Sequence, residues 1–271
     1  MSVQNFIQTV WSNDILIGLE PESKLVQGCH RKYEGDVDHA KTVKILGVGK
    51  PTIKKYDKAV GLGDPDLMTD DGQELVITEA NSFHFLVDDV DHAQSVPGLR
   101  EEYTRLSTQG LALERDAYVA SLIKNAKNKV TCEALTEAGV KAAIDKAIVN
   151  LRDRYFRERG RIELNPAAYN MFKNNLITLS TDNPDYIKRG IVGMYDGFEV
   201  IMSSNMAKDT DFAYCDIRGY KAIAFAGQIN KVEAYRSTKY FGDEVRGLDT
   251  FGAKLIDEDR IEVVKIPLVA A

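Results

Sequence analysis

Two short acidic groups, each ending in a histidine, contain the side chains best suited to hold a metal ion. The first group is Asp88, Asp89, Asp91 and His92, and the second is Asp36, Asp38 and His39. Carboxylate and imidazole groups bind hard or borderline divalent cations. The first group also precedes a predicted helix at residues 95–127, where negative charge stabilises the positive end of the helix dipole. We therefore interpret it as an electrostatic cap, and a soluble metal-dependent enzyme is the alternative.

Other motifs that could carry chemistry are incomplete. The segment 47–52, GVGKPT, is similar to a phosphate-binding loop, but Lys44 stands where the first glycine belongs and Pro51 follows the lysine. His30 and His84 lack a serine or cysteine partner in a triad-like motif, and no GxSxG sequence occurs. The sequence therefore predicts no catalytic residue, no bound metal and no cofactor, and it argues against an enzyme.

The composition is that of an ordinary globular protein. The chain has 271 residues, of which 44% are hydrophobic and 28% charged, and a chain of this length typically forms about two domains. Its net charge of −6 argues against a dedicated nucleic-acid-binding protein. Residues 1–19 lack a basic flank and are interrupted by Asn13 and Asp14, so we expect neither a signal peptide nor a membrane span. Three widely spaced cysteines predict reduced structural thiols: Cys29, Cys132 and Cys215.

The segment 95–127 is predicted to be one long helix. Small and apolar residues recur every three or four positions, at Leu99, Tyr103, Leu106, Gly110, Leu113, Ala117 and Ala120, with Leu111, Tyr118 and Leu122 on one flank. This spacing places them in one stripe along a helix. Such a helix is about 45 Å long, and a role as a rigid spine competes with that of an ordinary core helix. Gly110 would permit either close packing or a bend.

A long β-hairpin is predicted before this helix. Residues 42–57 read as its outgoing arm and residues 75–87 as its returning arm, joined by a tip of turn residues and acids. An isolated two-stranded hairpin is marginally stable in water, so it needs another surface. The alternative is a pair of strands inside a larger sheet.

The remaining elements are short. An apolar segment at 3–19 carries the single tryptophan. A second helical region covers 131–156, with Val140, Ile144, Ile148, Leu151 and Tyr155 on its apolar face and Thr131 or Thr136 as its cap. Further predicted elements are a strand at 161–164, a helix at 165–176, a hairpin of strands 191–195 and 198–202 turning at Asp196-Gly197, and strands near 221–226, 231–236, 244–256 and 260–266.

Taken in order, these segments resemble the major capsid protein of tailed bacteriophages, with its Hong Kong ninety-seven-like fold. The likeness is carried by residues 33–36 (YEGD), 85–94 (FLVDDVDHAQ), 193–205 (GMYDGFEVIMSSN), 241–247 (FGDEVRG) and 251–255 (FGAKL). The order and spacing of these motifs are more specific than any one of them. The resemblance spans nearly the whole chain.

The resemblance implies an α+β fold with four parts. These are an N-terminal arm at 1–35, an extended β-hairpin loop at 36–80, a peripheral domain at 81–160 and 230–271 that includes the spine helix 95–127, and an axial domain at 161–229. Because the given sequence starts at the arm, we expect the long N-terminal scaffolding segment of some relatives to be cleaved, separate or never present.

The resemblance also implies a structural role. It predicts that copies of the chain assemble as pentamers and hexamers into an icosahedral phage head around double-stranded DNA, without sequence-specific DNA binding. Implied partners are a scaffolding protein, a portal and a decoration protein, with assembly in the host cytoplasm and no membrane. The rival of the same fold is an encapsulin-like nanocompartment shell, which packages enzymes instead of a genome.

The arm and the hairpin are expected to contact neighbouring subunits, because neither can bury its own apolar face. The expected contact residues are Phe6, Trp11, Lys54, Lys55, Asp64, Asp66 and Asp70. Some relatives also cross-link a hairpin lysine to an asparagine of a neighbour. The lysines at the corresponding place are Lys50, Lys54, Lys55 and Lys58, and nothing in the sequence shows such a bond.

Overall fold

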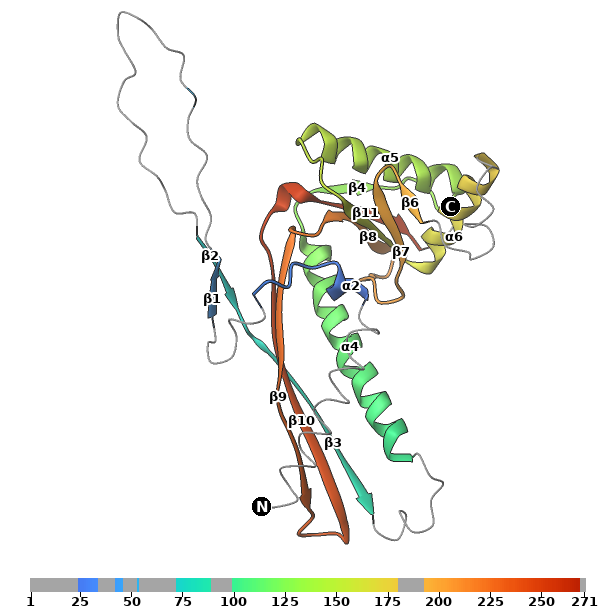
Figure 1. Cartoon of the computed structure of the whole chain (residues 1–271). Coiled ribbons are helices and arrows are strands. Elements are labelled where there is room, and N and C mark those ends of the chain that lie inside the picture. Colours follow the sequence, from blue (N-terminus) through green and yellow to red (C-terminus); the bar gives the residue numbers. More distant parts are fainter. Residues whose placement is uncertain are drawn as a thin grey trace, which may run out of the picture.

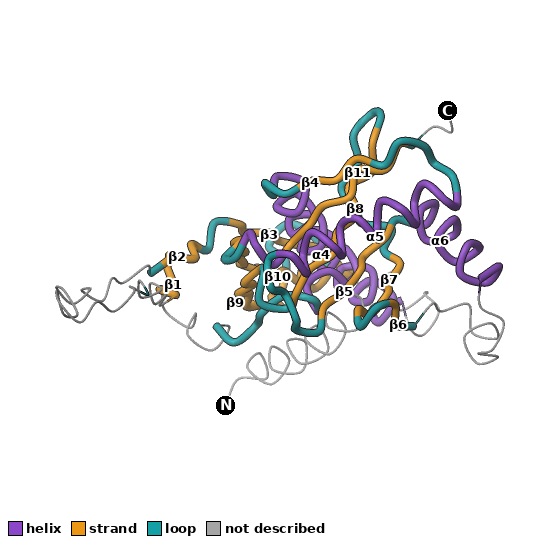
Figure 2. Tube along the Cα trace, turned by 90° about the horizontal axis from the view of Figure 1, so that it is seen from above, coloured by secondary structure: helices purple, strands orange, loops and turns teal. Residues whose placement is uncertain are grey.

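The computed structural model describes residues 24–33, 42–45, 53, 72–88, 99–179 and 193–268. Within these ranges the molecule is elongated (Figure 1). A six-stranded sheet and two helices form one end, and a three-stranded sheet and a long helix extend from it. A separate two-stranded sheet lies beside the three-stranded sheet. Seen from above, it lies at the opposite end of the molecule from helix α6 (Pro166–Leu179) (Figure 2).

The long helix, α4 (Leu99–Asn125), confirms the helix predicted at 95–127 over the residues described. Its regularly spaced apolar stripe, however, is for the most part not the buried side of the helix. Tyr103, Leu106 and Leu113 are 48%, 51% and 50% exposed, so most of the stripe faces solvent. The buried side is formed instead by Leu111, Ala112, Arg115, Asp116, Val119, Ala120 and Ile123. Hydropathy pointed to the wrong face because two charged residues with specific partners lie on the buried one.

Gly110 lies on the exposed side of α4. A methyl group added there would meet no atom within 4 Å. Within the described subunit, Gly110 therefore does not permit a close approach of another element, which was one of its two expected roles.

The three-stranded sheet has the order β3 (Glu79–Asp88), β10 (Gly242–Leu255) and β9 (Ile223–Arg236), with antiparallel pairing throughout. The strands predicted at 221–226 and 231–236 are one continuous strand, β9, whose register with β10 shifts at Leu248/Asp249. One face of this sheet packs against α4 through Phe83, Phe85, Val245, Leu111 and Ala112.

The six-stranded sheet has the order β4-β11-β8-β5-β7-β6. Its strands are β4 (Lys129–Thr131), β5 (Gly160–Leu164), β6 (Met194–Tyr195), β7 (Phe198–Met202), β8 (Phe212–Gly219) and β11 (Ile261–Pro267). A short 3-10 helix at Glu258–Arg260 precedes β11. The turn predicted between β6 and β7 is confirmed, since Asp196 and Gly197 have φ of 46° and 82°, which suits a tight hairpin. The central strand β8 was not predicted.

Helices α5 (Glu137–Asp153) and α6 pack together and contact this sheet. Their first turns are capped by side chains, because Thr136 Oγ1 accepts a hydrogen bond from Gly139 N at 3.1 Å and Asn165 Oδ1 one from Ala168 N at 2.9 Å. The prediction that Tyr155 continues the apolar face of α5 is wrong. The helix ends at Asp153, and Tyr155 has a φ of 62° and is 84% exposed.

Two hydrophobic cores lie on opposite faces of the six-stranded sheet. One face, with Ile162, Leu164 and Ile217, packs against α5 and α6. The other, with Tyr214 and Val263, packs against α4 and a short helix, α2 (Lys24–Gln27). Among the described residues, no helix combines the length and the apolar character needed to cross a membrane.

The stem of the predicted hairpin is present as β1 (Thr42–Ile45) and β2 (Gln73–Val76), which pair antiparallel. The prediction that 75–87 forms one returning arm is wrong in part, because residues 79–88 leave the hairpin and pair with β10 as β3. The rest of the predicted loop, residues 53, 72, 77 and 78 excepted, lies outside the described residues.

Candidate assembly surfaces

The predicted contact residues cannot be placed. Phe6, Trp11, Lys54, Lys55, Asp64, Asp66 and Asp70 lie outside the described residues, as do Asp89, Asp91, His92, Asp36, Asp38, His39, Lys50 and Lys58. Asp88 is the last residue of β3. In the part of the chain that the structure describes, no group of three or more His, Cys, Asp or Glu side chains is arranged to hold a metal ion. The surfaces below therefore come from residues that the sequence analysis did not single out for binding.

Helix α2, the first described element, is anchored on α4 by one buried carboxylate. Asp116 accepts hydrogen bonds from the backbone N–H groups of Lys24 and Val26, each at 3.2 Å, and from Asn205 Nδ2 at 3.2 Å. The first N–H groups of a helix have no partner inside it, so Asp116 acts as its cap. The chain preceding residue 24 therefore joins the body of the protein at α4.

A buried charge cluster lies directly beneath α2. Glu163 of β5 and Asp216 of β8 face each other across the strand pair, and both are fully buried. Arg218 donates to both oxygens of Glu163, at 2.9 and 2.7 Å, and to the backbone oxygen of Leu25 in α2 at 2.8 Å. One guanidinium thus joins the six-stranded sheet to the first described helix.

Asp216 has fewer hydrogen-bond partners than Glu163, the other carboxyl of this cluster. Its Oδ2 lies 3.2 Å from Arg218 Nε, but neither of its oxygens has a hydrogen-bond partner among the described residues. Burial raises the pKa of Asp216 well above its ordinary value, and the charge of Glu163 raises it further. Burial likewise raises the pKa of Glu163, although Arg218 opposes the rise. The cluster therefore retains protons at pH values where an exposed carboxyl has lost them.

The stem of the hairpin is fixed to the same body. Val43, Ile45 and Leu75 are buried against Ala224 and Ala226 of β9. Gln73 Nε2 donates to Ile256 O at 2.9 Å, and Lys254 Nζ donates to Glu74 O at 3.0 Å. The base of the loop is thus held by the subunit itself.

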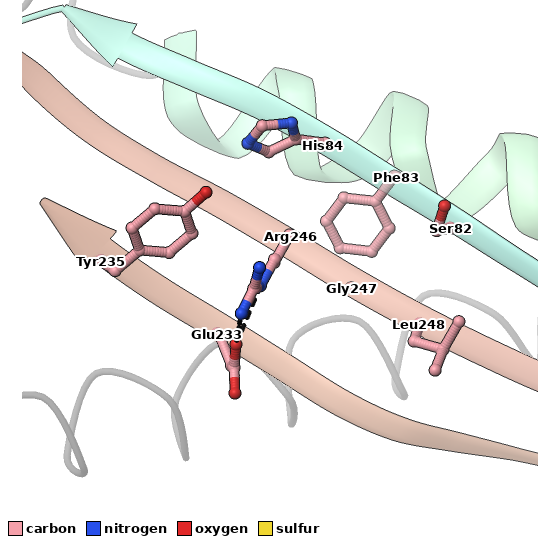
Figure 3. A pocket seen from close by; sticks show the side chains of 8 residues that line it. All are labelled: Ser82, Phe83, His84, Glu233, Tyr235, Arg246, Gly247 and Leu248. Atoms are coloured by element: carbon pink, nitrogen blue, oxygen red, sulfur yellow. Dashed lines mark hydrogen bonds and ion pairs between the residues drawn. The ribbon is translucent and has the colours of Figure 1, made fainter. Parts of the chain in front are cut away.

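The second face of the three-stranded sheet carries a row of polar and aromatic side chains around a shallow hollow of about 410 Å³ (Figure 3). Arg246 of β10 pairs with Glu233 of β9 and lies over the ring of Tyr235 at 5.0 Å. Glu244 accepts from Tyr235 Oη at 2.5 Å and lies 2.9 Å from His84 Nε2. Hydrogen bonds from Ser237 and then Tyr235 lower the pKa of Glu244, so it is an anion at neutral pH.

This hollow has the features of a contact surface. Its charged groups already pair with one another across the strands, and no serine or cysteine nucleophile in it is hydrogen-bonded to a base. On the face that packs against α4, Phe83 and Gly247 pair in register, and the Phe83 ring occupies the space that a side chain at Gly247 would fill. The polar and aromatic row on the second face therefore forms an amphipathic sheet face, hereafter the flat sheet face, of the kind that binds another protein surface.

Two further surfaces are apolar. The outer side of α4 exposes Tyr103, Leu106 and Leu113. The β9–β10 turn exposes Tyr240 and Phe241, the latter to 82%. Exposed apolar groups that cluster in this way mark interaction sites.

The chain is similar to solved phage structures over most of its length. A structure described as Mycobacterium phage Che8 is 26% identical with a TM-score of 0.78, covering 89% of this chain and 90% of that one. The capsid structure of cyanophage P-SCSP1u is 14% identical with a TM-score of 0.68, covering 86% and 84%. The mature capsid of bacteriophage PhiM1 is 15% identical with a TM-score of 0.65, covering 86% and 84%.

No family model and no curated protein matches the chain. The similarity of fold nevertheless extends over nearly nine-tenths of the residues of this chain. The chain therefore has the α+β fold of phage capsid structures, as its resemblance to the major capsid proteins of tailed phages implied.

Proposed function

We propose that this chain is the major structural subunit of a phage head, and that its copies assemble as pentamers and hexamers into an icosahedral shell around double-stranded DNA. The observation that carries this proposal is the match to phage capsid structures over 86–89% of the chain. The flat sheet face, the aromatic turn and the outer side of α4 support it, because each leaves contact area that the described subunit does not cover.

The parts of the subunit would divide this work. Residues 1–35 would form an arm, 36–80 an extended loop, 81–160 with 230–271 a peripheral domain and 161–229 an axial domain around the symmetry axes. Phe6 and Trp11 of the arm and five charged loop residues would contact neighbouring subunits: Lys54, Lys55, Asp64, Asp66 and Asp70. Weak contacts repeated at every subunit of a closed shell give a stable whole.

The partners would follow from this role. A scaffolding protein would guide assembly in the host cytoplasm, a portal would admit DNA, and a decoration protein would bind the finished virion. A chain of net charge −6 suits a container, because it does not hold DNA by excess positive charge.

The contents of purified particles test this function. Particles are isolated from cells that produce the chain with its genomic neighbours, treated with nuclease and opened. Nuclease-protected double-stranded DNA is the expected result. Particles that hold a protein cargo and no DNA would instead identify a nanocompartment shell.

A further inference from the structure

An apolar stripe runs along the outer side of α4. Its first member, Tyr103, stacks on Phe85 of β3 with ring centroids 5.8 Å apart, and the members that follow are exposed among the described residues. Tyr103, Leu106 and Leu113 are each about half exposed, and Ala117 continues the row. Gly110, between them, leaves open space. From Tyr103 to Ala117 the stripe is about 21 Å long at 1.5 Å per residue. Half-exposed leucines in a continuous row gain stability when another apolar segment covers them.

The described chain begins beside this stripe. The backbone N–H groups of Lys24 and Val26 bind Asp116, which precedes Ala117 by one residue. At 100° per residue, Asp116 lies about 60° around the helix from Leu113 and about 100° from Ala117. Asp116 thus lies at the border between the buried side of α4 and the stripe. Any segment that precedes α2 leaves the body at one end of the stripe.

The preceding segment has the composition and the reach to cover it. Residues 3–19 contain nine large apolar side chains: Val3, Phe6, Ile7, Val10, Trp11, Ile15, Leu16, Ile17 and Leu19. Seventeen residues span about 25 Å even when helical, and more when extended. Only four residues, 20–23, separate this segment from α2. A tether that short gives a high effective concentration at the stripe, of the order of millimolar.

We infer that, in the unassembled subunit, residues 3–19 dock on the Tyr103–Ala117 stripe of their own chain. Docking within the chain covers apolar surface through which free subunits would otherwise aggregate non-specifically. It makes the arm a segment that must leave α4 before Phe6 and Trp11 can contact a neighbour. The inference concerns the free subunit and can fail while the proposed shell function stands.

The single tryptophan makes this docking measurable. Trp11 is the only tryptophan in the chain, so fluorescence of dilute, unassembled subunits reports its surroundings alone. Leu113→Glu and Leu106→Glu each place a charge in the stripe at a half-exposed position. Both are expected to shift Trp11 emission to longer wavelength and to increase acrylamide quenching, while circular dichroism retains the helix signal. Val149→Glu, at a 55% exposed position on α5, is the matched control and should leave emission unchanged.

Dilution distinguishes docking within the chain from docking between chains. If the stripe is covered by its own chain, Trp11 emission is independent of protein concentration. Emission typical of a solvent-exposed tryptophan in the unaltered subunit would overturn the inference. So would an emission that Leu113→Glu and Leu106→Glu leave unchanged, or one that shifts to longer wavelength on dilution.

Discussion

Arg115 of α4 and Asp249 of β10 form a buried ion pair where the register of the three-stranded sheet shifts. Arg115 Nε lies 2.8 Å from Asp249 Oδ2, and Nη2 lies 2.5 Å from Oδ1. The guanidinium carbon also lies 5.7 and 5.9 Å from the ring centroids of Phe225 and Phe251. The β9–β10 register shifts between Leu248 and Asp249. The pair therefore fixes the long helix to the sheet at one defined point.

Removing one member of this pair should be costly. Asp249→Asn leaves the Arg115 guanidinium buried without its counter-ion, and such changes cost about 3–5 kcal/mol of unfolding free energy. Urea unfolding of the unassembled subunit measures this loss. Glu233→Gln is the control, since it breaks a pair whose Arg246 side chain is 57% exposed and should cost at most about 1 kcal/mol. Equal losses in the two variants would contradict this role for Arg115 and Asp249.

The cluster beneath α2 should make stability depend on pH. The pKa of Asp216 is raised in the folded protein by burial and then by the charge of Glu163. A carboxyl with a raised folded pKa binds its proton more tightly when folded, so its stabilisation is complete below the unfolded pKa and is lost as pH rises through the folded pKa. Asp216→Asn keeps the shape but cannot titrate. The unfolding free energy of Asp216→Asn should therefore fall less between pH 5 and pH 9 than that of the unaltered chain. This range lies above the ordinary carboxyl pKa of about 4, so Asp216 is already ionised there in the unfolded chain.

The matched control for this titration is Asp243→Asn, an exposed carboxyl in β10 whose side chain is 65% accessible. Asp243→Asn should have the same pH dependence as the unaltered chain. Parallel curves for the unaltered chain and Asp216→Asn would refute the assignment of the pH dependence to this cluster.

The cysteines should be unreactive in the folded subunit. Burial raises the pKa of Cys29 to about 11 and that of Cys215 to about 12, and it also raises the pKa of Cys132. Because the thiolate is the reactive form, a thiol-specific reagent at pH 8 should modify Cys29 and Cys215 at least about 100-fold more slowly than an exposed cysteine, and Cys132 should also react more slowly. In denaturant, all three cysteines of the chain should react. Rapid modification of folded subunits would show that at least one thiol is accessible.

Gly110→Ala tests the second idea about the centre of α4, that of a bend. The added methyl meets no atom within 4 Å, and alanine favours a helix over glycine by about 1 kcal/mol. We expect a higher unfolding temperature and unchanged shell assembly and expansion. Normal folding combined with a failure to expand would instead support a bend at this residue.

Deleting residues 59–72 separates folding from assembly. The stem is held through Val43, Ile45 and Leu75, outside the deletion. The subunit should therefore keep its unfolding cooperativity and its circular dichroism spectrum while shell yield falls. A shortened chain that no longer folds would show that these residues belong to a core.

The sequence predicted the positions of helices and strands better than it predicted which side of a helix is buried. The regular spacing of α4 identified the helix, but the buried side is defined by Arg115 and Asp116, whose partners lie far away in the chain. Hydropathy cannot anticipate that a charged residue is buried when its counter-ion, Asp249, is 134 positions away. The same limitation hid β8, because Asp216 and Arg218 interrupt its apolar pattern.

The candidate surfaces were predicted only in outline. The turn at Asp196-Gly197 followed from local turn chemistry, which sequence alone determines well, and the hairpin stem followed from the extended pattern of its two arms. The polar row of His84, Glu233 and Arg246 depends on the register of three strands that are distant in sequence, so no local signal indicated it. The predicted contacts at Phe6, Trp11 and the loop residues remain predictions.

Electron cryomicroscopy of the chain produced with its genomic neighbours tests the central claim most directly. The account predicts closed icosahedral shells in which copies of this subunit surround fivefold and sixfold positions. Its flat sheet face, aromatic turn and extended loop should lie in contacts between subunits. Folded protein that forms no closed shell, even with its scaffold present, would contradict the account.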